Sequence, residues 1–483
     1  MHGLRFDNRF QALGAAFYTA LAPTGFANPH LVAVNPEVAR LVGLESETLA
    51  TPQFLAWASG NAEAPGSAPL AMVYAGHQFG GYTPQLGDGR GLLLGQVHTP
   101  DGLLDLHLKG AGKTPYSRFA DGRAVLRSTI REYLAGEALH GLGVPSTRAL
   151  AIVGSDEPVV REQVESGAML IRVARTHIRF GSFEFFHHRQ RPDEVRALAD
   201  HVIATYLPEL ATTTQPHVAL FRHAVHATAR LIAHWQAVGF CHGVMNTDNM
   251  SILGETLDFG PYGFLDAYDP EHICNHSDHE GRYAYNRQPA IGLWNCNALA
   301  HGLSSLIAVD DLRTVLYEYE PLLLAELRRH QRAKLGLERE LPGDAALADD
   351  LLALLARGGI DYTLFFRALC DFESEGANSA LRDLCPDRAA FAAWAARYAA
   401  RLAAETRPAA ERRAAMRQVN PVYVLRNYLA ETAIRAAVDR GDYREIDRLR
   451  RALAQPYEDN SEFTAYGAPP PDWGRGIAVS CSS

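Results

Sequence analysis

Hydrophobic and polar positions alternate with the period of a β-strand in the segment LLDLHLKG, which begins at Leu103. Leu104, Leu106 and Leu108 alternate with Asp105, His107 and Lys109, so the two kinds of side chain point to opposite faces. A glycine-rich stretch and an apolar run precede this segment, and the turn TPDG at 99–102 joins that run to it. The pattern predicts a β-hairpin with Lys109 on its polar face.

Three further apolar segments, RALAIVG, PVVREQV and AMLIRVAR, predict additional short strands. Helical spacing replaces the strand period over 123–141, where Leu126 and Leu134 lie on one apolar stripe. This predicted helix carries Glu132. The region 81–180 is therefore expected to be rich in β-structure and to contain one helix.

From about residue 192 onward the pattern becomes mainly helical. Two long helical segments extend to about residue 240. A polar loop, HGVMNTDN, and an Asp-Phe-Gly sequence follow, and the final third contains several amphipathic segments. The second half of the chain is therefore expected to be a helical structure interrupted by one polar loop.

Composition and charge exclude several classes of function. The chain has 483 residues, of which 47% are hydrophobic and 21% charged, enough for more than one hydrophobic core. A net charge of -9 argues against general binding to nucleic acids or anionic membranes, because both need a cationic protein surface. No signal peptide or long uncharged apolar segment is recognisable, and the six cysteines include no CxxC pair. We expect a cytoplasmic, monomeric protein with no nucleic-acid and no membrane partner.

Four residues occur in the order of a kinase nucleotide site. Lys109 lies on a predicted strand, Glu132 on the next helix, Asn249 at the end of the polar loop, and Asp258 in the Asp-Phe-Gly sequence. A glutamate can hold the lysine ammonium against triphosphate oxygens, while an amide oxygen and a carboxylate are hard ligands for Mg²⁺. Each motif alone is weak, but their joint order predicts a site for ATP and magnesium.

The polar loop departs from the phosphotransferase pattern. A kinase loop of the type HGDxxxxN places its catalytic Asp five residues before its Asn, and Val244 stands there in this chain. Asp248 is the only carboxylate in the loop. Either the site is inactive, or it catalyses a different reaction with Asp248 as the base.

The phosphate-binding elements also differ from those of a kinase. The spacing of Gly87, Gly89 and Gly91 does not match GxGxxGxV, and the loop adds Arg90.

Arg172 lies in a predicted strand and Arg179 follows it shortly. Paired arginines near a lysine would bind a pyrophosphate group firmly, which suits pyrophosphate as a leaving group. Alternatively, both arginines pair with carboxylates on the protein surface. The residues alone leave both interpretations open.

Long strings of the chain closely resemble the selenoprotein O family: KGAGKTPYSRFADGRAVLRSTIREYL, HGVMNTDNMSILGETLDFGPYGFLD, NPVYVLRNYLAE and the ending SCSS. The resemblance spans almost the whole chain. It implies a pseudokinase fold in which ATP lies inverted relative to active kinases. The α-phosphate is then presented for transfer of AMP to Ser, Thr or Tyr hydroxyls of proteins, and pyrophosphate is released. Such a reaction would account for Val244 at the position of the usual base.

The resemblance assigns roles to matching positions. Lys109, Arg172 and Arg179 would hold the outer phosphates, and Glu132 would orient Lys109. Asp248 would accept the proton of the attacking hydroxyl, although an Asp beside a cation should stay ionised at neutral pH. The other implied residues are Gly87, Gly89, Arg90, Asp121 and Gly122, which would line the nucleotide pocket, and Asn249 and Asp258, which would bind magnesium.

Three alternatives stay open at this point. The chain could transfer UMP, with manganese as the metal. It could be a small-molecule phosphotransferase, against which Val244 argues. It could also be a non-catalytic, nucleotide-binding pseudokinase scaffold, against which the retained Asn249 and Asp258 argue. The family's association with redox proteins makes thiol-redox enzymes the first candidates for protein substrates.

A redox pair is also implied by the resemblance. Cys481 lies third from the end of the chain, where some family members carry selenocysteine, and Cys274 is its implied partner. A thiol in a flexible tail can reach a distant partner at a small loop-closure cost. The expected disulfide would restrict substrate access, and its reduction would open the site.

Pattern and resemblance together predict an α+β, protein-kinase-like bilobal fold. It has a β-rich N-lobe, a helical C-lobe and additional extensions at both ends. The predicted divisions are an N-terminal extension over 1–80, the N-lobe over 81–180, the C-lobe with the catalytic loop over 181–330, and a C-terminal helical extension with the redox tail over 331–483.

Overall fold

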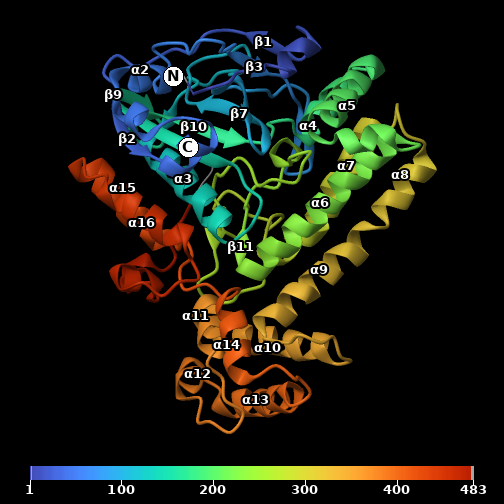
Figure 1. The fold of residues 1–483 in the computed structure, drawn as a ribbon, viewed down its shortest axis with the longest axis vertical. Coiled ribbons are helices and arrows are strands. Elements are labelled where there is room, and N and C mark those ends of the chain that lie inside the picture. The colour runs from blue at the N-terminus through green and yellow to red at the C-terminus, as the bar shows by residue number, and fades with distance from the viewer. Residues whose placement is uncertain (2, 480–483) are drawn as a thin grey trace.

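The computed structural model describes residue 1 and residues 3–479, and its largest sheet has eight antiparallel strands (Figure 1). The strand order is β1-β3-β6-β7-β10-β9-β2, and β8 pairs with β10. Two small two-stranded sheets, β4-β5 and β11-β12, lie outside it. The strands are β1 Tyr18–Ala20, β2 His30–Val34, β3 Leu70–Met72, β4 Gly76–Gln78, β5 Gly81–Thr83, β6 Gly91–Thr99, β7 Gly102–Lys109, β8 Ala124–Val125, β9 Arg148–Val160, β10 Val164–Ala174, β11 Phe240–Cys241 and β12 Gly263–Phe264.

Helices make up most of the rest of the described chain, which confirms the expected combination of an antiparallel sheet with many helices. They are α1 Pro36–Leu41, α2 Pro52–Ala58, α3 Leu126–Gly141, α4 Phe180–His187, α5 Pro192–Tyr206, α6 Pro216–Val238, α7 Gln288–Leu303, α8 Val309–Leu316, α9 Tyr319–Lys334, α10 Asp344–Gly358, α11 Tyr362–Leu369, α12 Ser379–Leu384, α13 Arg388–Leu402, α14 Ala409–Arg417, α15 Asn427–Arg440 and α16 Arg444–Ala454. No described helix is long and apolar enough to cross a lipid bilayer.

The predicted hairpin is confirmed as β6 and β7, which pair from Gly91 opposite Lys109 to Thr99 opposite Gly102. Leu104, Leu106 and Leu108 of β7 pack in one hydrophobic cluster with side chains of α2. The opposite face carries Asp105, His107 and Lys109, which are 1%, 4% and 8% exposed. This polar face is therefore buried within the protein, where its charges need internal partners.

Two boundaries differ from the sequence prediction. RALAIVG and the start of PVVREQV form one strand, β9, and the chain then turns into β10, so PVVREQV spans a turn. The helix predicted from 123 begins only at Leu126, because Ala124 and Val125 pair with β10 as strand β8. The position of Glu132 within the helix is unaffected.

The segment before residue 81 contributes to the same sheet. β1 and β3 continue it beyond β6, and β2 continues it beyond β9. The predicted division at residue 80 stays a prediction, as do the other divisions.

Helix α3 lies between the sheet and two helices from the C-terminal part of the chain. It packs on β9 and β10 on one side and on α15 and α16 on the other, although these helices are about 300 residues away in sequence (Figure 1). Because α3 is covered on both sides, Glu132 is buried and lies next to the sheet.

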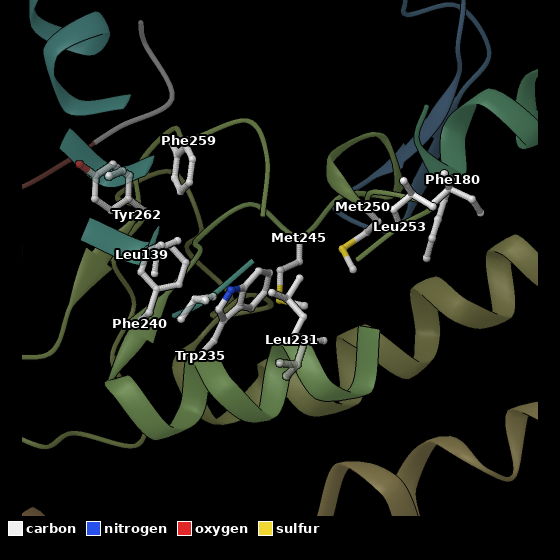
Figure 2. Packing of buried hydrophobic residues seen from close by; sticks show 14 of the residues in the cluster. Leu139, Phe180, Leu231, Trp235, Phe240, Met245, Met250, Leu253, Phe259 and Tyr262 are labelled. Atoms are coloured by element: carbon white, nitrogen blue, oxygen red, sulfur yellow. The ribbon is translucent and has the colours of Figure 1, made fainter. Parts of the chain in front are cut away.

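The polar loop after α6 rests on that helix. Figure 2 shows Met245 packed beside Leu231 and Trp235 of α6, and Met250 and Leu253 packed beside Phe180 of α4. The indole of Trp235 also donates a hydrogen bond to Thr256 Oγ1 (3.0 Å). Apolar side chains between the polar residues therefore pack the loop against its neighbouring helices.

Candidate active site

A pocket of about 530 Å³ lies between the sheet and the loop that follows α6. Its walls come from the glycine-rich loop, β7, β10, the polar loop and the Asp-Phe-Gly segment. The structure brings nine of the predicted site residues together in this wall: Gly87, Gly89, Arg90, Lys109, Arg172, Arg179, Asp248, Asn249 and Asp258.

Glu132 lies behind the wall and binds two of its cations. Its carboxylate accepts a hydrogen bond from Lys109 Nζ and another from Arg172 Nε (2.7 Å). Burial opposes ionisation of this group, but the charges of Arg172 and Lys109 outweigh burial and hold the pKa of Glu132 below its usual range. Glu132 therefore positions both cations toward the pocket.

Asp258 is the second anion of this network. It accepts from Arg172 (2.8 Å) and Arg179 (2.6 Å), and its backbone has a positive φ of 60°. Burial opposes its ionisation, yet the two arginines hold the pKa of Asp258 well below the usual range. The alternative that these arginines pair with surface carboxylates is wrong, because both are 2% exposed and their partners face the pocket or its inner wall.

Asp248 is held in a short 3-10 turn, Thr247–Asn249, and is 7% exposed. Gln78 Nε2 donates to its Oδ2 (3.2 Å), while its Oδ1 is buried and has no hydrogen-bond partner among the described residues. Burial raises the pKa of Asp248 to about 7, and the charge of Arg179 opposes this only in part. Without a cation beside it, this carboxylate is therefore harder to ionise, because desolvation outweighs the charge of Arg179, and the expectation that a neighbouring cation keeps it ionised stays a prediction.

Val244 lines the pocket where a phosphotransferase would carry its base. His242 supports this loop, since its ring accepts from Val244 N (3.3 Å) and contacts Leu257 O (3.1 Å). Asn249 Nδ2 donates to Val244 O (3.0 Å), which leaves the amide oxygen of Asn249 for another partner. The loop therefore presents Asn249 and Asp248, and no acid at position 244.

Asn249 and Asp258 fit a Mg²⁺ or Mn²⁺ ion. An amide oxygen and an ionised carboxylate, both in the pocket wall, are hard oxygen ligands. Across residues 1 and 3–479, no group of three His, Cys, Asp or Glu side chains could hold a metal. This donor set suits magnesium, which is commonly held by one or two protein ligands together with substrate phosphates.

The glycine-rich loop closely approaches the segment around Tyr116. Gly87 has a φ of +100°, and a Cβ there would lie 2.6 Å from the Tyr116 ring. A Cβ on Gly89 would lie 2.9 Å from the Tyr116 carbonyl oxygen, and Ser117 donates to Gly89 O. Glycine is needed at Gly87 because of its positive φ and the close Tyr116 ring, and at Gly89 because the two backbones touch. Their spacing therefore follows from this contact and not from the kinase pattern.

Asp121 and Gly122 do not line the pocket. The Asp121 carboxylate accepts from Arg161 (2.7 and 3.0 Å) and from the backbone of Arg123 (2.8 Å). The neighbouring Ala120 does line the pocket, so this segment forms its rim. The structure thus gives Asp121 a partner within the rim.

Sequence reasoning missed Tyr74, Asp88 and His107 in the pocket wall. The Arg179 guanidinium lies over the Tyr74 ring, 4.3 Å from its centroid. His107 lies 3.4 Å from the Asp88 carboxylate and stacks on His177 (ring centroids 4.6 Å apart). The strand period could have revealed His107, which shares a face with Lys109. Tyr74 lies in an apolar run and had no such signal.

Cys274 is buried, and its thiol donates to Cys241 O (3.5 Å). The five described cysteines are all free. The predicted partner, Cys481, lies outside the described residues. Val479 forms a bridge with Asn275, the residue after Cys274, and accepts a hydrogen bond from His276 N (2.8 Å).

Comparison with known proteins identifies the family of this chain. The family described as "Protein adenylyltransferase SelO" matches residues 1–454. Proteins named "Protein nucleotidyltransferase YdiU" are 53% identical in Myxococcus xanthus, 52% in Pseudomonas fluorescens and 51% in Thiobacillus denitrificans. These alignments cover 99 to 100% of this chain and 99% of each relative. The chain therefore belongs to the SelO family of protein adenylyltransferases.

Proposed function

We propose that this protein transfers AMP from ATP to Ser, Thr or Tyr hydroxyls of other proteins and releases pyrophosphate. One observation carries the proposal. The pocket retains the nucleotide-binding set of a kinase, Lys109 with Glu132 and Asn249 with Asp258, but has Val244 in place of the phosphotransfer base. The same pocket offers Asp248 as a different carboxylate. A site that binds ATP and lacks the usual base fits transfer of a different part of the nucleotide.

The proposal includes a kinase-like bilobal arrangement, with the sheet and α3 as one lobe and the helices from α4 onward as the other. It is supported by the position of the pocket, whose walls come from both parts of the chain. The Lys109–Glu132 pair comes from the sheet side, and Asp258 from the helical side. Arg172 joins both sides, since it donates to Glu132 and to Asp258.

Four cations would bind the triphosphate. Lys109, Arg90, Arg172 and Arg179 all line the pocket, and three of these are arginines, which suit bidentate contacts with phosphate oxygens. Glu132 keeps Lys109 and Arg172 in place before ATP arrives. A strongly held β,γ-pyrophosphate favours cleavage next to the α-phosphorus.

Asn249 and Asp258 would hold the divalent cation, Mg²⁺ or Mn²⁺. When bound, the cation would neutralise phosphate charge and polarise the phosphate oxygens. Asp258 is suited to this role because it stays ionised.

Asp248 would accept the proton in the transfer step. The acceptor hydroxyl oxygen bonds to the α-phosphorus, the bond from this phosphorus to the bridging oxygen breaks, and pyrophosphate leaves with that oxygen. The hydroxyl proton moves to the free Oδ1 of Asp248, whose other oxygen is held by Gln78. Gln78 thereby orients the base.

The protein substrates, with thiol-redox proteins as the first candidates, stay part of this proposal, as do a monomeric state and a cytoplasmic location. A redox switch is also proposed, in which a Cys274–Cys481 disulfide closes the site. The bridge between Val479 and Asn275 supports it, because it brings the chain close to Cys274 two residues before Cys481. Forming the bond would need an oxidant that takes two electrons and two protons from the thiols.

Labelled ATP tests the main proposal. ATP labelled at the α-phosphate should transfer label to the enzyme or to a protein acceptor, whereas γ-label should leave as pyrophosphate. Stable γ-label on an acceptor would instead show a kinase, and absence of transfer with nucleotide bound would show a scaffold. Repeating the α-label assay with UTP and Mn²⁺ separates AMP transfer from UMP transfer.

A further inference from the structure

A second pocket, of about 150 Å³, has a lining separate from that of the active-site pocket. It is bounded by the C-terminal end of α9, by α10 and α11, and by Tyr268 and Tyr285. Figure 1 shows α9 ending beside α10 and α11, away from the large sheet. No residue lines both this pocket and the active-site pocket.

Lys334 is the unusual residue of this pocket. It is the last residue of α9 and is 5% exposed. Among the described residues, no carboxylate pairs with its ammonium, which instead lies over the rings of Phe366 (4.3 Å to the centroid) and Tyr362 (5.0 Å). Burial lowers the pKa of Lys334 to about 7. The interaction of an ammonium with ring faces is weaker than the free-energy cost of removing the ammonium from water. The charge of Lys334 is therefore incompletely compensated.

Apart from Asp349, which is paired with Arg328, the other titratable groups near Lys334 supply no negative charge. The thiol of Cys370 is buried, and burial raises its pKa above the usual value. His234 and His330 also lie close enough to interact electrostatically with Lys334. Burial lowers their pKa values to about 4 and about 3, so both are neutral at pH 7. At the mouth of the pocket, Arg328 is already paired with Asp349 (2.6 and 2.8 Å).

The chain uses lysine rarely. Only three of its 46 Lys and Arg residues are lysines: Lys109, Lys113 and Lys334. Lys109 faces the nucleotide pocket, and Lys113 is exposed. In a chain that places arginine at nearly every other basic position, a buried lysine indicates a position that suits a compact ammonium and not a planar guanidinium.

We propose that this pocket binds a small organic anion, a monocarboxylate with a compact apolar body. One incompletely compensated cation matches one carboxylate, which would accept from Lys334 Nζ. The rings of Tyr362 and Phe366 and the side chain of Leu351 would enclose the body. A cavity of about 150 Å³ is large enough for a benzene-sized group in an apolar protein interior. Nucleotides are too large and carry too much charge for this volume.

Benzoate is the probe that tests the proposal. Calorimetric titration into the full-length protein, with saturating ATP present to fill the active site, should show one binding site. Benzamide has the same shape without the charge and should bind at least about tenfold more weakly, because it cannot pair with the ammonium. Lys334→Met should weaken benzoate binding by at least about the same factor, whereas Lys113→Met should not change it.

Several outcomes would overturn the proposal. These are no binding of benzoate, equal binding of benzamide, or unchanged affinity in Lys334→Met. The benzamide comparison uses the unaltered protein, so it decides the question even if Lys334→Met folds poorly.

Discussion

Arg179 donates a hydrogen bond of 2.6 Å to Asp258 Oδ2 in the wall of the candidate active-site pocket. Arg172 donates to the other carboxylate oxygen (2.8 Å) and also to Glu132. One continuous charged network therefore runs from α3 through β10 to the Asp-Phe-Gly segment.

Asp258→Asn should reduce AMP transfer by at least about 100-fold, because the amide neither carries charge for a cation nor pairs as strongly with the arginines. The melting temperature should fall less than in Glu132→Gln, since Arg172 keeps Glu132 as a partner and Arg179 keeps its bonds to the His177 and Asp248 carbonyl oxygens. Asp156→Asn, at an exposed position of β9, is the matched control. Full activity together with a severe loss of stability would assign Asp258 a structural role.

Asp248→Asn should lower kcat by about 10² to 10⁴ while the affinity for ATP stays similar, because the amide cannot take the hydroxyl proton. Equilibrium binding of a nonhydrolysable ATP analogue and initial rates on the same preparation give the two quantities. A normal kcat in Asp248→Asn would exclude this residue as the base.

Glu132→Gln should destabilise the protein by about 3 kcal/mol at pH 7, because it leaves Lys109 and Arg172 buried without their carboxylate. The folded-state pKa of Glu132 is lowered, so its contribution is fully present above its unfolded value of 4.5 and is lost as the pH falls through the lower folded value. Urea unfolding should therefore show a difference in the free energy of unfolding between the parent protein and Glu132→Gln, and this difference should become smaller below pH 4.5. If this difference in the free energy of unfolding did not depend on pH, the charge of Glu132 would not be the cause of the destabilisation.

Gly87→Ala should raise the KM for ATP and lower stability by about 1 to 3 kcal/mol, because it combines a positive φ with a clash against Tyr116. Gly102→Ala is the control for backbone strain, since Gly102 has a φ of +115° and open space around it. Gly102→Ala should leave the KM unchanged. Equal effects of the two variants on the KM would show that the Tyr116 contact does not shape the site.

Oxidation should give a cross-linked Cys274–Cys481 peptide in mass spectrometry without reduction, and a dithiol should then raise AMP transfer. The response to the dithiol should disappear in Cys481→Ser. Cys241 is the competing partner, because Cys274 donates to its carbonyl oxygen (3.5 Å), so Cys241→Ser should keep the response. Both cysteines free after mild oxidation, or a Cys241–Cys274 cross-link, would contradict the switch.

The sequence by itself determined the elements that carry the candidate site residues. The strand period placed Lys109, the helical stripe placed Glu132, and motif spacing identified Asn249, Asp258 and the absence of an acid at Val244. Local periodicity suffices for this because it depends on neighbouring residues along one strand or helix. Family membership was also readable from continuous strings of residues.

Only the tertiary structure decided how each charge is compensated. The polar face of β7 is buried because distant segments cover it, and Asp248 has a pKa of about 7 because burial outweighs Arg179. Tyr74 lies under Arg179 although nothing in its apolar segment indicated a site residue. Desolvation and ion pairing depend on contacts between residues that are distant in the sequence, and local sequence patterns do not indicate those contacts. The same reason hid Lys334, whose ammonium has aromatic rings around it and no carboxylate among the described residues.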